Sequence, residues 1–237
     1  MFPPHEMAKL PTRGHEFNRV QVKVDDEPER EQTEDSEMSS DEERILGNSL
    51  NYSSPSPLKN TTSEFWQMIF QKKIKAIVTL SGSNVEKNED DCAPYWKEKS
   101  KSYNDLEVDL TDENPCGSYT ERSFEIRHTK RKDIRKVSQF HYNQWEDVLP
   151  KETKGLLEMI QKIRKIISST KLEEQNRRDR SVPLVVHCSD GSKRTGTFCG
   201  LWNLLQSAQV EEVIDVFQTV KHLRRQRSGM VSSFVSI

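Results

Sequence analysis

The sequence predicts an α/β fold, a twisted mixed β-sheet flanked by helices. Short apolar or alternating runs typical of strands recur along the chain, and amphipathic helical patterns stand between them. One apolar run passes through a glycine-containing turn directly into a helix, as α/β folds often do. The 237 residues are enough for one large α/β domain or two small ones, and we predict a single one.

Composition and charge argue against several classes of protein. The net charge of −2 does not suit a nucleic-acid-binding protein, which usually carries a basic face or tail. The four cysteines are too few and too irregularly spaced for a disulfide framework, and no CxxC pair indicates zinc. We therefore expect a reducing compartment, no metal and no cofactor. Because no apolar run has the length of a signal peptide or a membrane span, we expect a cytoplasmic chain without a transmembrane segment.

The chain divides into three predicted parts. Residues 1–24 form an N-terminal segment with the first strand, and residues 58–237 form the folded domain. Residues 25–57 are expected to be a disordered insert, because residues 25–43 hold eleven Asp or Glu and cannot bury enough apolar surface to offset the entropy of ordering. Gly, Asn, Ser and Pro over residues 44–57 favour turns and irregular structure.

Two serines in the insert predict a modification. Ser39 and Ser40 each stand three residues before an acid, a spacing that suits kinases with a preference for acidic substrates. We therefore expect a kinase of this kind as a partner. Phosphate would make an already negative segment more negative.

The folded part is predicted to begin with a helix and to continue with strands. Thr61 followed by Glu64 fits a capping box, and apolar residues at helical spacing follow it. Strand patterns come next, at residues 76–80, 106–110, 120–128 and 137–142.

Two helical patterns and one more strand complete the expected elements. An apolar stripe from Leu156 to Ile167 predicts a helix that ends in a polar linker over residues 168–180. Residues 182–186 read as a buried strand. A final helix is expected to place five apolar residues on one face: Val210, Val213, Ile214, Phe217 and Val220.

The chemistry of the chain is predicted to lie just after the buried strand. A strand, a tight turn and a helix bring consecutive backbone N–H groups around one point at the positive end of a helix dipole, where an anion binds. A cysteine in that position, Cys188, is expected to have a lowered pKa and to act as a nucleophile. The predicted phosphate-binding residues are Ser189, Asp190, Gly191, Ser192, Lys193 and Arg194.

Individual positions in this loop have distinct expected roles. Arg194 stands six residues after Cys188, so its planar fork can return over the site and bind two phosphate oxygens. The hydroxyl of Thr195 can donate to the sulfur, and Gly191 relieves the sharp turn. Asp190 places a carboxylate near an incoming phosphate, and charge repulsion is expected to weaken binding.

The run from His187 to Gly196, His-Cys-x5-Arg-Thr-Gly, resembles the signature of the cysteine-dependent protein tyrosine phosphatases. Residues 65–69, 77–78, 92–96, 124–128 and 139–142 also resemble core segments of that family, in the same order. The resemblance implies the tyrosine-phosphatase fold and hydrolysis of phosphotyrosine-containing proteins through a cysteinyl-phosphate intermediate. It implies Cys188, Arg194 and Thr195 as catalytic residues, with Asp147 as the general acid.

The chain departs from the family pattern in ways that imply weak hydrolysis. Glu146 stands where the family has a proline beside the acid, nothing in residues 1–16 resembles the family's Lys-Asn-Arg-Tyr segment, and the chain ends where a glutamine loop and a last helix are expected. The alternative is a catalytically impaired pseudophosphatase, a regulatory or phosphotyrosine-docking module of a receptor phosphatase. A first phosphatase domain of a longer receptor would then be a partner, at the inner face of the plasma membrane.

Overall fold

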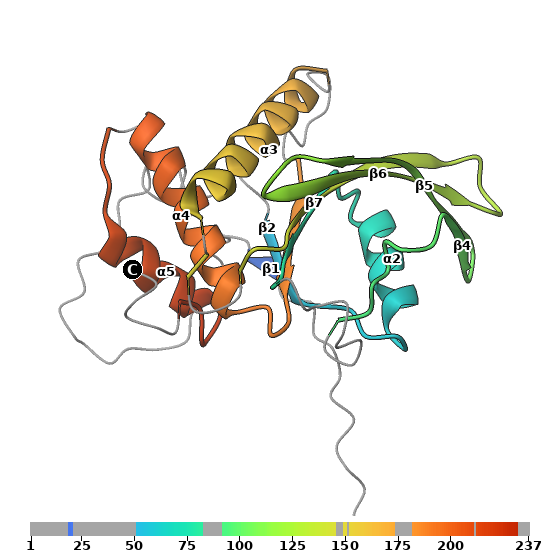
Figure 1. The fold of residues 1–237 in the computed structure, drawn as a ribbon, viewed down its shortest axis with the longest axis horizontal. Helices are drawn as coiled ribbons and strands as arrows, with labels where there is room; N and C mark the ends of the chain where they lie inside the picture. Colours follow the sequence, from blue (N-terminus) through green and yellow to red (C-terminus); the bar gives the residue numbers. More distant parts are fainter. Residues whose placement is uncertain are drawn as a thin grey trace, which may run out of the picture.

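An eight-stranded mixed β-sheet organises the chain, in the strand order β1-β2-β8-β3-β7-β6-β5-β4 (Figure 1). The computed structural model describes residues 19–20, 51–82, 92–145, 149–150, 152–173, 182–210 and 212–231. The strands are β1 (Arg19–Val20), β2 (Asn51–Pro55), β3 (Ala76–Leu80), β4 (Ser100–Tyr103), β5 (Leu106–Pro115), β6 (Tyr119–His128), β7 (Ile134–Tyr142) and β8 (Leu184–Cys188). The helices are α2 (Thr62–Gln71), α3 (Thr153–Glu173), α4 (Lys193–Val210) and α5 (Val216–Gln226).

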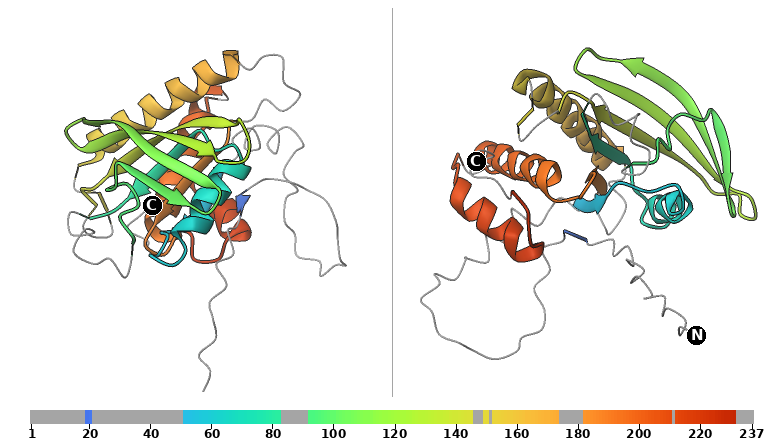
Figure 2. Two further views of the ribbon diagram at one scale, coloured as in Figure 1. Left: turned by 90° about the vertical axis from the view of Figure 1, so that its right-hand side faces the viewer. Right: turned by 60° about the horizontal axis from the view of Figure 1, so that its bottom comes forward.

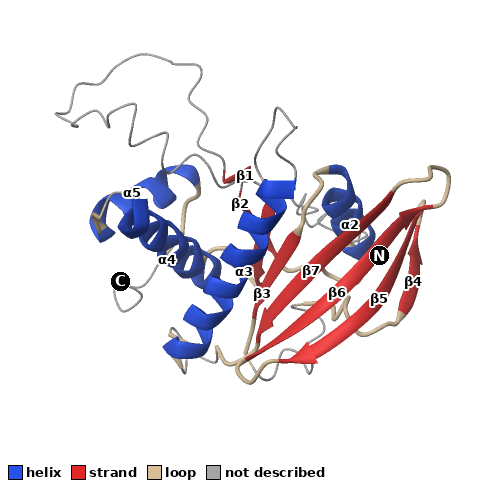
Figure 3. Cartoon of the chain, turned by 90° about the horizontal axis from the view of Figure 1, so that it is seen from above, coloured by secondary structure: helices blue, strands red, loops and turns tan. Residues whose placement is uncertain are grey.

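The sheet has a parallel and an antiparallel part. β2, β8, β3 and β7 run parallel, so their carboxyl ends meet at one edge of the sheet, where Cys188 lies. Strands β4 to β7 pair antiparallel and extend to one side of the molecule (Figure 3). Parallel strands buried on both faces need helices on both faces, and the chain supplies them.

Successive residues of β3 serve two different cores. Ala76, Val78 and Leu80 pack in a core formed with α3, α4 and α5, whereas Ile77 packs in a second core formed with α2. Side chains alternate across a strand, so a wholly apolar strand can fill both cores at once. The right-hand view of Figure 2 shows α2 separated from α4 and α5 by the middle strands.

The predicted fold class is confirmed, and one prediction about the insert is wrong. Residues 51–55, expected to be irregular, form β2, which pairs with β8 from Asn51 opposite Leu184 to Pro55 opposite Cys188. Asn, Ser and Pro have low intrinsic preference for strands, but pairing beside a central buried strand overrides it. Residues 25–50 of the insert lie outside the described residues.

The capping box predicted for α2 is absent. The Thr61 side chain makes no capping bond to the helix; its hydroxyl oxygen accepts from the Leu58 N–H at 2.9 Å. The Thr62 hydroxyl donates to the Leu58 carbonyl at 2.9 Å. The two threonines therefore stabilise the turn before the helix, a competing use of short polar side chains that sequence spacing cannot distinguish from a cap.

Two helix boundaries differ from those predicted, and β4 was missed. α3 runs on to Glu173, well into the expected linker at 168–180. α5 begins at Val216 because Asp215 caps it, accepting from the Gln218 N–H at 2.9 Å. Val213 and Ile214 therefore lie before the helix and are exposed, and Val210 ends α4.

Among the described helices none is long and apolar enough to cross a membrane.

Candidate active site

The predicted phosphate loop lies where the central strand of the sheet meets the N-terminus of a helix. β8 runs between β2 and β3, and all five of its residues are buried. The chain then turns through residues 189–192 and enters α4 at Lys193. The first N–H groups of α4 have no partner inside the helix, so this turn can collect an anion. We call residues 188–194 the phosphate loop.

Gly191 allows the phosphate loop to lie against β2. Its φ is +68°, and its N–H donates to the Cys188 carbonyl at 3.2 Å. A Cβ at this position would lie 2.4 Å from the backbone nitrogen of Pro55 and 2.4 Å from the carbonyl carbon of Ser54. The turn therefore needs glycine for two reasons, its left-handed backbone and its contact with β2.

The Cys188 sulfur lies beneath the phosphate loop with two polar contacts. The side chain is 1% exposed. The Thr195 hydroxyl donates to Sγ at 3.1 Å, the contact expected from the sequence. The thiol in turn donates to Oδ1 of Asp190, at 3.3 Å. The sulfur is therefore held between a donor that favours the thiolate and a carboxylate that favours the thiol.

The expectation of a lowered pKa for Cys188 is wrong for this arrangement. Burial raises the pKa of the thiol, and the Asp190 carboxylate raises it further, whereas the hydrogen bond from Thr195 lowers it. A buried thiol beside a carboxylate keeps its proton, because a second negative charge there would be both poorly solvated and repelled. In this state of the loop the sulfur is mainly thiol at neutral pH.

The Asp190 carboxylate occupies the N–H groups that a phosphate would use. Oδ1 accepts from the Ser192 N–H at 2.8 Å and from the Lys193 N–H at 3.1 Å. Burial raises the pKa of Asp190, but these two backbone hydrogen bonds, together with those from the side chains of Cys188 and Ser192, outweigh it and hold the pKa below the usual range. The loop therefore binds a carboxylate of its own at the start of α4.

The other predicted phosphate-binding residues surround this carboxylate. Ser189 and Lys193 are exposed, and Ser192 and Arg194 are half-buried. The Lys193 ammonium is 3.8 Å from Oδ2 of Asp190. Within the described part of the chain the Arg194 side chain forms no hydrogen bond or ion pair, so its guanidinium is available for a ligand.

Arg227 supports the loop from outside and was missed in the sequence. From just beyond α5, its guanidinium donates to the Asp190 carbonyl at 3.3 Å and to the Ser53 carbonyl and hydroxyl at 3.3 and 3.2 Å. One planar fork thus joins the phosphate loop to β2. Arg227 stood in a run of basic residues, and nothing in the run distinguished it from its neighbours.

His187 anchors the strand end directly before the nucleophile. It is fully buried, and burial lowers its pKa to about 3, so the ring is neutral. Its Nε2 is 3.0 Å from the Thr79 hydroxyl and 2.8 Å from the Tyr95 hydroxyl, and its Nδ1 is 3.1 Å from the Ser56 hydroxyl. The neutral ring is satisfied on both nitrogens, which fixes the end of β8.

The hydrogen bonds continue from this histidine through the sheet. The Gln139 amide donates to the hydroxyls of Thr79 and Tyr95, at 2.9 Å each, and its carbonyl accepts from Arg122 at 3.3 Å. Arg122 also lies 3.3 Å from Nδ1 of His141. The chain of polar groups therefore crosses β8, β3, β7 and β6, and the sequence signal for it was polar residues at inward positions of apolar strands.

A family model described as protein-tyrosine phosphatase matches residues 16–236. The chain belongs to the protein-tyrosine phosphatase family. The resemblance predicted from the loop is thus confirmed, and with it membership of an enzyme family. Receptor-type tyrosine-protein phosphatase C of Homo sapiens is 49% identical over 179 residues, which are 75% of this chain and 14% of that protein.

Other receptor-type tyrosine phosphatases match over a similar span. The type C protein of Mus musculus is 45% identical over 179 residues, 75% of this chain and 14% of the relative. Receptor-type tyrosine-protein phosphatase alpha of Homo sapiens is 38% identical over 182 residues, 76% of this chain and 21% of the relative. The chain therefore covers only a small part of the length of these phosphatases.

The general acid that a tyrosine phosphatase needs was predicted at Asp147, which lies outside the described residues. The chain leading to it is described as far as Trp145, which is fully buried and whose N–H donates to the Ser81 carbonyl at 3.1 Å. Ser81 follows β3, so the segment before Asp147 leaves the sheet at the same edge as Cys188. Among the described residues, no group of His, Cys, Asp or Glu is arranged to hold a metal ion.

Proposed function

We propose that this domain hydrolyses phosphotyrosine in proteins through a cysteinyl-phosphate intermediate, and that it does so slowly. The observation that carries the proposal is the Cys188 sulfur, 3.1 Å from the Thr195 hydroxyl, at the end of β8 and before the N-terminus of α4. A nucleophile at an anion-binding turn suits attack on a phosphate monoester. Arg194, in the first turn of α4, supports the same function because its side chain has no hydrogen bond or ion pair within the described residues.

The reaction takes place in two displacements. Cys188, as thiolate, attacks phosphorus and the bond to the tyrosine oxygen breaks, while Asp147 gives a proton to that oxygen. Arg194 binds two of the phosphate oxygens. Water then attacks phosphorus and gives a proton to the Asp147 carboxylate, the bond to sulfur breaks, and the Thr195 hydroxyl stabilises the departing thiolate. The role of Asp147 rests on the family resemblance.

The slow rate follows from the place of Asp190. A phosphate that enters the loop needs the N–H groups of Ser192 and Lys193, and Asp190 already holds both. The carboxylate must swing out before substrate binds, and Cys188 must lose the proton that it shares with that carboxylate. Each requirement adds to the free energy of the transition state relative to the free enzyme.

Turnover of p-nitrophenyl phosphate by the native chain and by three variants tests the proposal. We expect slow hydrolysis by the native chain, none above background by Cys188→Ser, and a value of kcat/KM about 10-fold higher for Asp190→Ser, which corresponds to about 1.4 kcal/mol. Lys165→Gln, an exposed lysine on α3, serves as a control without effect. Native activity equal to that of Cys188→Ser, together with an inactive Asp190→Ser, would contradict the proposal.

A second candidate function is a regulatory or phosphotyrosine-docking module of a longer receptor phosphatase. The binding of the loop N–H groups by Asp190 of the loop itself favours this function. The relatives are named receptor-type phosphatases, which supports a place in a longer receptor. In that case the domain acts at the cytoplasmic face of the plasma membrane beside a first phosphatase domain, and an acidophilic kinase modifies Ser39 and Ser40. Binding of a phosphotyrosyl peptide to Asp190→Ser with no turnover of any substrate would select this function.

A further inference from the structure

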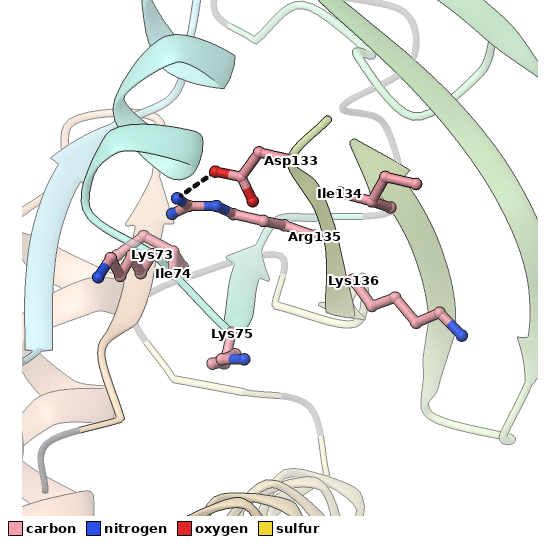
Figure 4. Close-up of a pocket in the computed structure, with 7 residues that line it drawn as sticks. All are labelled: Lys73, Ile74, Lys75, Asp133, Ile134, Arg135 and Lys136. Carbon is pink, nitrogen blue, oxygen red and sulfur yellow. Dashed lines mark hydrogen bonds and ion pairs between the residues drawn. The ribbon is translucent and has the colours of Figure 1, made fainter. Parts of the chain in front are cut away.

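A basic pocket lies at the edge of the sheet opposite the phosphate loop. Its volume is about 610 Å³, and it is lined by Lys73, Ile74, Lys75, Asp133, Ile134, Arg135 and Lys136 (Figure 4). The first three residues join α2 to β3, and the rest stand at the start of β7. β3, β7 and β8 are parallel, so the pocket is at their amino ends and Cys188 is at a carboxyl end. The pocket is therefore separate from the candidate active site.

The lining has more positive than negative charge. Four side chains are cationic, and one, Asp133, is a carboxylate that pairs with Arg135 at 2.9 Å. Within the described part of the chain Lys73 and Lys136 form no ion pair, and both are exposed. The pairing of Asp133 with Arg135 leaves a surplus of positive charge around the pocket, which attracts an anion.

Arg135 is held in place on one wall of this pocket. Its guanidinium stacks over the Phe70 ring, 4.2 Å from the centroid, and donates to the Phe70 carbonyl and to Asp133. The side chain is only 21% exposed. A guanidinium that is already ordered loses little further entropy when a ligand binds.

Lys73 is at a position where glycine would suit the backbone better. Its φ is +55°, in the left-handed region, one residue after the C-cap of α2. The N–H of Lys73 donates to the Phe70 carbonyl at 3.2 Å and that of Ile74 to the Ile69 carbonyl at 3.0 Å, which closes the helix in the way usually assigned to glycine. A long cationic side chain at a strained backbone position indicates a use for the side chain.

The acidic stretch of this chain is tethered at the same edge of the sheet. β1 and β2 pair with Val20 opposite Asn51, so the intervening residues 21–50 leave and rejoin the sheet at one place. Across the sheet, Asn51 is in register with Leu184, Leu184 with Ala76, and Ala76 with Ser138. Asn51 is therefore level with the first residue of β3 and with the fifth residue of β7, and the pocket lies one to five residues further toward the amino ends of these strands.

The chain between the acidic stretch and β2 is long enough for the stretch to reach the pocket. Adjacent strands are about 4.8 Å apart, so the strand that Lys75 precedes is about 10 Å across the sheet from Asn51. Asn51 stands eight positions after Glu43, the last acid of the stretch, and an extended chain of that length spans up to about 26 Å. Residues 25–43 carry eleven acids and one arginine, so their charge is opposite to that of the pocket.

From this placement we propose that the pocket binds the acidic stretch of the same chain, residues 25–43, and that phosphate on Ser39 or Ser40 strengthens the contact. A tethered segment has an effective concentration on the order of millimolar, so weak intrinsic affinity is enough for occupancy. Lysines recognise phosphate as point charges, and Arg135 adds a planar fork. The proposal is independent of whether the phosphate loop turns over substrate.

A labelled synthetic peptide of residues 25–43 tests the proposal on the full chain. The peptide is titrated into the native chain and into a neutralised chain, in which the eleven acids of residues 25–43 are changed to Asn or Gln. We expect at least about 10-fold tighter binding to the neutralised chain, because the native segment competes for the pocket. The doubly phosphorylated peptide should bind more tightly still, and rising salt should weaken both.

Pocket variants in the neutralised chain distinguish binding of the peptide at the pocket from its general attraction to basic side chains elsewhere. Lys73→Gly and Lys136→Gln should each weaken the peptide several-fold, whereas Lys165→Gln on α3 should not. Lys73→Gly should leave Tm unchanged or raise it, because glycine suits the left-handed backbone. Equal affinity for native and neutralised chains, or equal effects of the Lys136 and Lys165 variants, would overturn the proposal. Binding of pyrophosphate without binding of the peptide would also overturn it, since the pocket would then have another occupant.

Discussion

The two ends of the parallel strands present their positive groups in opposite ways. At the carboxyl end of β8, the N–H groups of Ser192 and Lys193 are already bound to a carboxylate two or three residues away, that of Asp190. At the amino ends of β3 and β7, Lys73 and Lys136 have no ion-pair partner within the described part of the chain. Positive groups alone therefore do not make a site available. What matters is which group the nearest carboxylate binds: Asp190 binds the loop N–H groups, whereas Asp133, which is equally close to Lys136 along the chain, pairs with Arg135.

The ends also differ in what supports them. The phosphate loop rests on buried hydrogen bonds from His187 and on the close contact of Gly191 with β2. The basic pocket rests on an exposed turn after α2 and the start of β7. Changes beneath the loop should therefore destabilise the whole fold, and changes in the pocket should not.

The largest expected effect is acid destabilisation through His187. Its pKa is lowered to about 3 in the folded state, against about 6.5 unfolded. The folded state therefore cannot take up the proton that the unfolded state binds, so this stability is complete above about pH 6.5 and declines as pH falls toward 3. The free energy of unfolding should fall by up to about 1.4 kcal/mol per pH unit for this histidine, measured by denaturant unfolding.

A substitution of His187 tests whether this histidine causes the pH dependence of the free energy of unfolding. His187→Gln should reduce the pH dependence below about pH 6, whatever its starting stability. Should that variant not fold, His141→Gln provides the same readout, because burial also lowers the pKa of His141 to about 3. A pH profile identical to that of the native chain in the folded variant would show that the histidine is not neutral as described.

Gly191→Ala should come next, with a loss of about 3 kcal/mol in the free energy of unfolding. The added Cβ meets the β2 backbone at 2.4 Å, and the residue must keep a φ of +68°. Lys73→Gly makes the opposite change at the other end of the strands and should not lower the free energy of unfolding. Thermal unfolding of both variants checks the comparison, and an equal loss at the two positions would break it.

A smaller loss of stability is expected for a change at Arg227. Arg227→Lys keeps the charge but loses the planar fork that joins the Asp190 carbonyl to Ser53, at a cost of about 1 kcal/mol. Amide exchange at Gly191 should accelerate while exchange at Lys75 stays as it was. Faster exchange at both ends would mean that the arginine supports the whole sheet rather than the loop.

Sequence patterns identified the parts of the molecule in which local preference and tertiary packing agree. The apolar run that became β3 and the strand and helix around Cys188 are of this kind. β2 was missed because its asparagine, serines and proline become a strand only through pairing with β8. The capping role given to Thr61 failed because its hydroxyl has a nearer partner in Leu58.

The candidate site shows the same division. The spacing of Cys188, Gly191 and Thr195 was enough to predict the turn and the hydrogen bond to sulfur. The direction of the Cys188 pKa was not predictable, because it depends on burial and on the rotamer by which Asp190 reaches the sulfur. Repulsion by Asp190 was expected, but its binding to the loop N–H groups depends on the three-dimensional path of the turn, which the sequence does not specify.

The Asp190 carboxylate occupies the phosphate loop and holds the Cys188 thiol protonated. The pKa of Cys188 tests it most directly, measured from the pH dependence of alkylation by iodoacetamide, with peptide-level mass spectrometry to separate Cys188 from Cys92, Cys116 and Cys199. In the native chain the reaction should report a pKa above the ordinary thiol range, and in Asp190→Asn it should report a clearly lower one, because the charge is removed while the side chain keeps its size. The same pKa in both proteins, or a native value below the ordinary range, would contradict the account.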